Sequence, residues 1–284
     1  MELKILFKKK KVKRQMEFTK NKYLKEMFEY RKILKTYPEF IPQFSFDNIV
    51  EFYESTEFDY FDFQQYSIPF FEDLSTLEYI DLLFSWIDKK LQHDGYTKYR
   101  GNLYGKDILE YAINKGGINC LMHGIILQEI LIKSGFKAHL VQCNPFDYKI
   151  GDCHWLINLF IPEFNKWMMI DPVWLGFCTD TDNIPLDFFE IRKSIIENQK
   201  ICINKKNKSS YYEYLMCRYL FFFGFFEKNG VGTFEEKGQK KVYVAPEGFN
   251  AKDFVRDKEV NRFLPYNIKE YLYFSRFEEN AKFI

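Results

Sequence analysis

The sequence predicts an α+β fold in which one apolar helix packs on an antiparallel sheet. Residues 119–133 have the composition of a helix that is buried on all sides. Two aromatic and β-branched runs, 153–160 and 166–171, are separated by a few turn residues, as in an antiparallel hairpin. The segments on either side of this core have mainly helical periodicity. We therefore expect N-terminal and C-terminal parts that are mainly helical.

Composition narrows the class of protein. The 284 residues can form one large domain or two small ones, and 20% aromatic residues allow a large core. A net charge of +1 gives no field that would attract nucleic acid, so no nucleic-acid partner is expected. No apolar signal segment follows the basic N-terminus, and the longest apolar run, Leu220–Phe226, is far shorter than the roughly 20 residues that span a bilayer. We expect a cytoplasmic protein with six reduced cysteines and no transmembrane segment, and we leave its oligomeric state open.

The N-terminal segments are expected to be largely helical. An amphipathic helix is predicted over 17–36 and a short helix over 46–55, and 56–71 is predicted to be a loop or short strand. The basic block at 8–14 is interpreted as a solvated arm, because one charged patch without aromatic partners is a weak indication of lipid or nucleic-acid binding.

Two further helices precede the apolar one. The first is predicted to begin after Ser75, because Glu78 three residues later completes a capping box, and to end before Asp94. The second is predicted over 106–114 and ends at the glycine pair Gly116-Gly117.

The apolar helix carries a cysteine at its start. Asn119 is a good N-cap, which places Cys120 in the first turn, where unpaired amides and the helix dipole favour the thiolate. Such positions can lower a cysteine pKa from about 8.5 to roughly 3.5–7.5. Gly135 is expected to end the helix. On this stretch alone an inert core thiol is the favoured interpretation, because free cysteine is among the most buried residue types.

The hairpin supplies two further groups. Pairing His154 directly with Asp171 places the centre of the hairpin at Pro162-Glu163, where proline interrupts the ladder. Directly opposed residues share a face with Cβ atoms about 5 Å apart, so Asp171 can orient the imidazole. If the apolar helix packs on that face, Cys120 meets His154. The three residues would then be a nucleophile, a base and an orienting carboxylate.

The other histidines and cysteines fit structural roles better. His123 lies one turn beyond Cys120 without a carboxylate to orient it, and Cys153 faces away from His154 on the strand. Adjacent strand residues diverge and no C-x₂-C pair is present, so no zinc site, and no other cofactor, is expected. His93, His139, Cys143, Cys178, Cys202 and Cys217 show no spacing that indicates a function.

The last third of the chain shows no recognisable chemistry. Helices are predicted over 185–198 and 209–226, and the aromatic content of the second suggests deep packing or an interface. A strand is predicted at 242–244 and a last helix over 251–263.

Four motifs in order resemble the transglutaminase-like superfamily: Gly117-Ile118-Asn119-Cys120, Gly135-Phe136-Lys137-Ala138, His154-Trp155 and Trp167-Met168-Met169-Ile170-Asp171-Pro172. The resemblance covers about 75–175. It implies a papain-like core with Cys120, His154 and Asp171 as the catalytic triad. It also divides the chain into an N-terminal extension over 1–70, a catalytic core over 71–180 and a C-terminal extension over 181–284.

The resemblance implies a cysteine enzyme that acts on an amide of a peptide or protein through a thioester acyl-enzyme. Hydrolysis is favoured over crosslinking, because the sequence reveals no second, amine-binding site. The Cys120 amide is one expected oxyanion donor. A second donor, for which Trp86, Gln92 and Asn102 are candidates, is not identified by any motif. Two alternatives stay open: acyl transfer of the arylamine N-acetyltransferase type, and an inactive binding or scaffold module.

Overall fold

A computed structural model describes residues 22–38, 51–52, 61–147, 152–205, 210–226, 228–235 and 241–249. It confirms a mixed α+β fold built on a seven-stranded sheet, with strand order β6-β5-β4-β3-β2-β7-β9. Every neighbouring pair in this sheet is antiparallel. A separate parallel pair joins β1 (Glu51–Phe52) to β8 (Lys228–Asn229).

The strands of the large sheet come from both halves of the chain. They are β2 (Ala138–Asn144), β3 (His154–Ile161), β4 (Lys166–Asp171), β5 (Gly176–Thr179), β6 (Cys202–Lys205), β7 (Phe222–Phe226) and β9 (Lys241–Val244). The three central strands are joined in sequence, β3 to β4 through a 3₁₀ turn, η2 (Pro162–Phe164).

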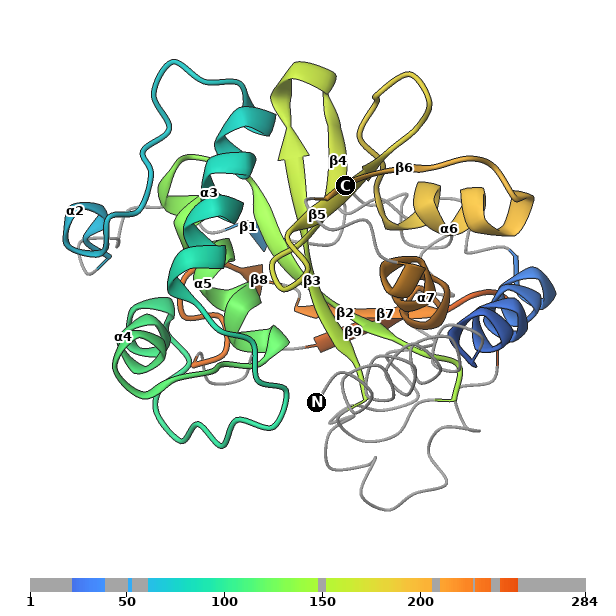
Figure 1. Cartoon of the computed structure of the whole chain (residues 1–284), viewed down its shortest axis with the longest axis horizontal. Coiled ribbons are helices and arrows are strands. Elements are labelled where there is room, and N and C mark those ends of the chain that lie inside the picture. Colours follow the sequence, from blue (N-terminus) through green and yellow to red (C-terminus); the bar gives the residue numbers. More distant parts are fainter. Residues whose placement is uncertain are drawn as a thin grey trace, which may run out of the picture.

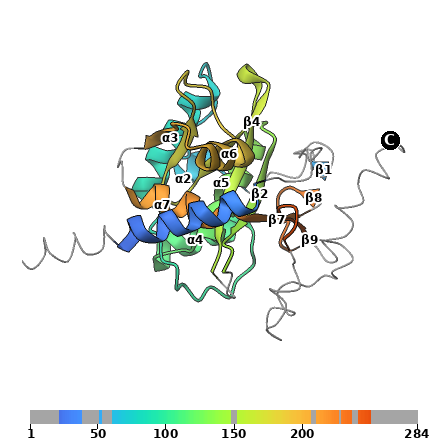
Figure 2. The same cartoon turned by 90° about the vertical axis from the view of Figure 1, so that its right-hand side faces the viewer.

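Helices cover both faces of this sheet (Figure 1). One face carries α2 (Phe63–Tyr66), α3 (Thr76–Lys90), α4 (Gly105–Lys115) and α5 (Cys120–Lys133). The other face carries α6 (Phe188–Glu197), α7 (Ser210–Tyr219) and the helix over 22–36, a face that Figure 2 turns toward the viewer.

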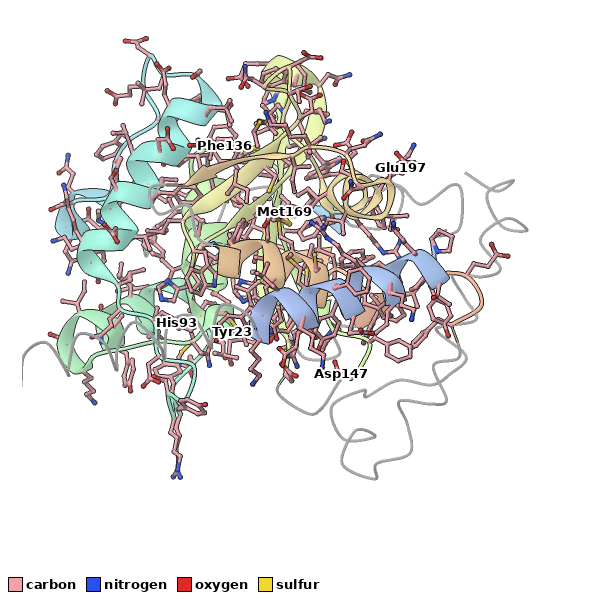
Figure 3. The ribbon with its side chains drawn as sticks, turned by 45° about the vertical axis from the view of Figure 1, so that its right-hand side comes forward. Tyr23, His93, Phe136, Asp147, Met169 and Glu197 are labelled. Carbon is pink, nitrogen blue, oxygen red and sulfur yellow. The ribbon has the colours of Figure 1, made fainter. Side chains whose placement is uncertain are left out.

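The sheet therefore separates two hydrophobic cores. Figure 3 labels one residue of each, Phe136 in the core beneath α3 to α5 and Met169 in the core beneath α6 and α7. Along β3, Trp155 and Ile157 belong to the first core and Leu156 to the second, as strand alternation requires. A sheet that is covered on both sides has no solvent face, so all seven residues of β2 are buried.

The apolar helix forms as predicted. The side chain of Asn119 caps α5 by accepting from the Met122 amide at 3.0 Å, and Gly135 follows the helix with φ +90°. α5 lies close to β2, since a Cβ added at Gly124 would overlap Leu140 Cδ2. The capping box of α3 is also present, with the Ser75 amide donating to Glu78 Oε2 at 2.9 Å.

Several predicted elements need correction. The segment 209–226 is not one helix: α7 ends at Tyr219 and β7 follows, because a short apolar run such as Phe222–Phe226 fits a buried strand as well as a buried helix. The described part of the C-terminal third also supplies β6 and β9, so that part is not mainly helical.

Two N-terminal predictions also change, and one C-terminal prediction stays untested. Part of 46–55 forms the strand β1. The segment 56–71, predicted to be a loop or short strand, contains α2, which Asp62 caps through the amides of Gln64 and Gln65. The helix predicted over 251–263 lies outside the described residues.

The close contact at Gly124 makes a prediction about stability. Gly124→Val should lower the free energy of unfolding by about 1–3 kcal/mol, because the added carbons overpack the contact between α5 and Leu140. Urea denaturation would measure the change. Gly95→Val is the control, since a Cβ there approaches only His93 Cε1, at 3.8 Å. Equal stability of the Gly124→Val and Gly95→Val variants would contradict the close packing of α5 on β2.

Candidate active site

Asp171 is held at the end of β4 by hydrogen bonds to both carboxylate oxygens. Oδ1 accepts from the backbone amides of Val173 and Trp174, each at 2.9 Å. Oδ2 is 2.9 Å from Nε2 of His154. Asp171 is 1% exposed and His154 8% exposed, so this pair is largely shielded from solvent. The turn fixes the carboxylate, and the carboxylate fixes the imidazole.

The pairing of β3 with β4 differs from the predicted register. Ile157 pairs with Ile170 and Ile161 with Lys166, so the hairpin is centred one residue later than predicted. The cause is a four-residue connection, in which η2 is followed by Asn165 in the left-handed region at φ 49°. His154 consequently lies diagonal to Asp171 rather than directly opposite. The displacement preserves the face of each side chain, so the two still meet.

Cys120 reaches this pair along an open edge of β3. Its sulfur lies 3.9 Å from the Cys153 carbonyl oxygen, and the His154 side chain and the Trp155 amide lie near enough to lower the pKa of its thiol. The Phe160 amide bonds toward β2, so the alternate peptide groups of Cys153 and Trp155 point to the β4 side. β4 has already ended there, and the sulfur lies where a strand would otherwise pair.

The helix that carries Cys120 packs on the face of the sheet opposite to the one we expected. α5 shares its core with Trp155 and Ile157, whereas the alternation of β3 and β4 turns His154 and Asp171 toward the other core. Contact is possible because Cys120 is the first residue of α5 and lies at the edge of β3 rather than over either face. The structure thus brings all three predicted residues together by a different route.

Electrostatics favour an ion pair between sulfur and imidazole. Burial by itself would lower the pKa of His154, but the charge and hydrogen bond of Asp171, with a further contribution from Cys120, raise the pKa to about 10. Burial by itself would raise the pKa of Cys120. The hydrogen bond and charge of His154, together with the amides of Trp155 and Leu121, lower it below its ordinary value. Both shifts are in the direction of a thiolate beside an imidazolium.

Several other thiols and imidazoles have pKa values that are shifted in the opposite direction to those of Cys120 and His154. Burial raises the pKa of Cys143 and Cys178 and raises the pKa of Cys217 to about 11, so these thiols stay protonated at neutral pH. Burial also lowers the pKa of His123 to about 4 and that of His139 to about 3, so both rings stay neutral. Cys153 is half-buried against the first core, on the side away from His154, and all six cysteines are free.

Of the suggested oxyanion donors, only Gln92 lies beside the cysteine segment. Its carbonyl accepts from the Ile118 amide at 2.8 Å, two residues before Cys120. Trp86 donates its indole N–H to the Tyr66 carbonyl at 3.1 Å, and the exposed Asn102 donates to Asp107 at 3.1 Å. Both of these side chains are therefore engaged elsewhere.

Sequence reasoning missed one aromatic neighbour of the site. The ring of Tyr219, at the end of α7, lies with its centroid 5.9 Å from that of His154. Its hydroxyl donates to Asp152, two residues before His154, at 2.8 Å. Residues so far apart in the chain carry no local pattern that would reveal their contact.

Comparison of the chain with protein-family models, with curated protein sequences and with solved structures finds no match. Within the part of the chain that the structure describes, no group of three or more His, Cys, Asp or Glu side chains has an arrangement that could hold a metal ion. The helices of that same part include none with the length and apolar character that crossing a membrane requires.

The two shifted pKa values predict how stability depends on pH. For His154 the pKa rises from 6.5 to about 10 on folding, so its contribution is complete below pH 6.5 and is lost as the pH rises through 10. For Cys120 the pKa falls below 9.0, so its contribution is complete above pH 9.0 and is lost as the pH falls through the folded value.

The contribution of Cys120 should therefore increase as the pH rises toward 9.0, and it should be lost as the pH rises through about 10, where His154 loses its proton. The measurement is the free energy of unfolding against pH for the wild type and for Cys120→Ala. The difference between them should increase toward pH 9.0 and decrease again above about pH 10. A difference that does not vary with pH would count against the ion pair.

Proposed function

We propose that the protein is a cytoplasmic, transglutaminase-like cysteine enzyme that acts on an amide bond of a peptide or protein. The observation that carries the proposal is the convergence of Cys120, His154 and Asp171, with 2.9 Å between the imidazole and the carboxylate and with the sulfur near enough to the imidazole for each to shift the pKa of the other. Their order along the chain and the motifs around them support a papain-like core as the scaffold. An antiparallel sheet with the cysteine at the start of a buried helix is compatible with that core.

Each residue has a role that its surroundings suit. The thiolate of Cys120 attacks the amide carbonyl carbon, and a tetrahedral intermediate forms. His154 gives its proton to the departing nitrogen as the C–N bond breaks, which leaves a thioester on the sulfur. Asp171 keeps the imidazole oriented, because its Oδ2 hydrogen-bonds with Nε2 and Nδ1 then remains available to exchange a proton at the sulfur.

The second half of the reaction releases the acyl group. His154, now neutral, takes a proton from water, and the hydroxide oxygen bonds to the thioester carbon. The C–S bond then breaks and the thiolate is restored. We favour water over an amine as the acceptor, because neither sequence nor site geometry suggests an amine-binding position. The first turn of α5 offers the Cys120 amide to the developing oxyanion, and Gln92, whose backbone carbonyl accepts from the Ile118 amide, stays a candidate for the second donor.

Selective alkylation tests the proposed nucleophile. Iodoacetamide near neutral pH should modify Cys120 faster than Cys143, Cys178 or Cys217, whose buried thiols are held protonated. His154→Ala should slow the modification of Cys120 by about tenfold or more, because without the imidazolium less of the thiol is ionised. The higher nucleophilicity of a more basic thiolate offsets only part of this loss.

Peptide mass mapping over time would give the rate at each cysteine. His139→Ala is the matched control, a buried imidazole in the second core that stacks on Trp167 at 5.2 Å, and it should leave the Cys120 rate unchanged. Slow, equal labelling of all six cysteines would instead favour an inactive scaffold.

Product analysis tests the class of acyl acceptor. With peptide substrates and a primary amine present, we expect free carboxylate to form at a rate that saturating amine changes little, and Cys120→Ala to abolish it. Mass spectrometry of the products distinguishes hydrolysis from amine incorporation. Acyl transfer from acetyl-CoA to an arylamine, without peptide cleavage or deamidation, would replace this assignment by an acetyltransferase.

A further inference from the structure

The last turn of α7 covers the imidazole from the second face of the sheet. The ring centroids of Tyr219 and His154 are 5.9 Å apart, with their planes inclined by 43°. The Tyr219 hydroxyl donates to Asp152 Oδ1 at 2.8 Å. Asp152 precedes β3 by two residues, so one short segment carries both His154 and the carboxylate that holds a ring against it.

Arg218 completes the support of this ring. Its Nη2 forms an ion pair with Asp152 Oδ2 at 2.5 Å, and its Nη1 donates to the Tyr214 hydroxyl at 2.8 Å. The guanidinium also lies over the rings of Tyr219 and Tyr30, at 5.4 and 5.5 Å. Both oxygens of Asp152 are thus engaged by neighbouring residues of α7, which restricts the position of the Tyr219 ring.

The groups around His154 show how the Tyr219 ring can stabilise the charged form of the imidazole. The groups near His154 come from four elements, namely Asp171 of β4, Cys120 and His123 of α5, Cys143 of β2 and Tyr219 of α7, and from His93 after α3. Burial holds both His93 and His123 toward the neutral form. An aromatic ring within about 6 Å attracts a cation. A phenol whose hydroxyl donates a hydrogen bond to a carboxylate has a more electron-rich ring, and the positive charge of Arg218 is balanced by Asp152.

We propose that Tyr219 is a positioning residue of this site, whose ring holds the imidazolium form of His154 beside Cys120, while Asp152 and Arg218 hold the ring. The inference rests on the proposed function, because it requires a charged imidazole in the resting site. It gives the last turn of α7 a direct part in setting the reactivity of the thiol. Residues from the C-terminal third then tune a triad that lies entirely before them in the chain.

The test is a nuclear magnetic resonance titration of the histidine rings in the full-length protein. The chain has only four histidines, and His154→Gln identifies the resonance of His154. Tyr219→Leu should lower the pKa of His154 by about 0.5–1.5 units relative to the wild type, because the cation loses its aromatic neighbour. Tyr219→Phe keeps the ring face and should retain most of the wild-type value.

Tyr214→Leu is the matched control. Tyr214 lies on the same helix and also contacts Arg218, but its ring packs on Tyr23 and Tyr30, at 5.0 and 6.1 Å. The Tyr214→Leu variant should leave the pKa of His154 at the wild-type value. Circular dichroism establishes that each variant is folded, and Tyr219→Phe keeps the comparison possible if the leucine variant is not.

The outcomes separate the two proposals. A wild-type His154 that titrates near its ordinary value, with an unreactive Cys120, overturns the proposed function and this inference together. A raised pKa that is the same in the wild type and Tyr219→Leu overturns the role of Tyr219 alone. An equal decrease in Tyr214→Leu also overturns it, since the effect would then come from loosening of α7 as a whole.

Discussion

The end of β4 at Pro172 determines how this site is assembled. In the register of β3 and β4, Pro172 stands where a partner for Trp155 would be, and proline has no N–H with which to continue the ladder. The chain turns instead into β5, and two amides of that turn hold Asp171. The edge of β3 that remains open receives the sulfur of Cys120. One interruption of the ladder thus both orients the carboxylate and makes room for the thiol.

The buried charges of the site depend on one another. Burial alone would make His154 and Cys120 neutral, because desolvation disfavours both charged forms. Each charge is retained only because a neighbour compensates it: Asp171 for the imidazolium, and the imidazolium with nearby amides for the thiolate. A buried ion pair is stable only when its remaining hydrogen-bonding capacity is also satisfied. The imidazole of His154 and the thiol of Cys120 therefore titrate as a coupled pair, and neither has a protonation state that is independent of the other.

The sequence predicted what local chemistry determines and missed what packing determines. The caps at Ser75 and Asn119 depend on residues only three positions apart, and both are present. The shared face of His154 and Asp171 follows from strand alternation. It was predicted correctly although the predicted register was wrong, because the left-handed backbone of Asn165 lengthens the connection between β3 and β4. The face on which α5 packs depends on long-range contacts, which no local pattern reveals. The same limit hid the contact between Tyr219 and His154.

The last third of the chain packs around the strands that carry the site. In β2, Cys143 pairs with His154 on one side and with Phe223 of β7 on the other, so β7 lies next to the strand that flanks the imidazole. α7 leads directly into β7 and ends at Tyr219. The boundary between a core and a C-terminal extension at residue 180 stays a prediction. Residues that contact His154 nevertheless come from both sides of this boundary. Cys120 begins a helix of the layer on one face of the sheet, whereas His154 and Asp171 face the other layer, so bringing the three residues together needs both layers of helices in place.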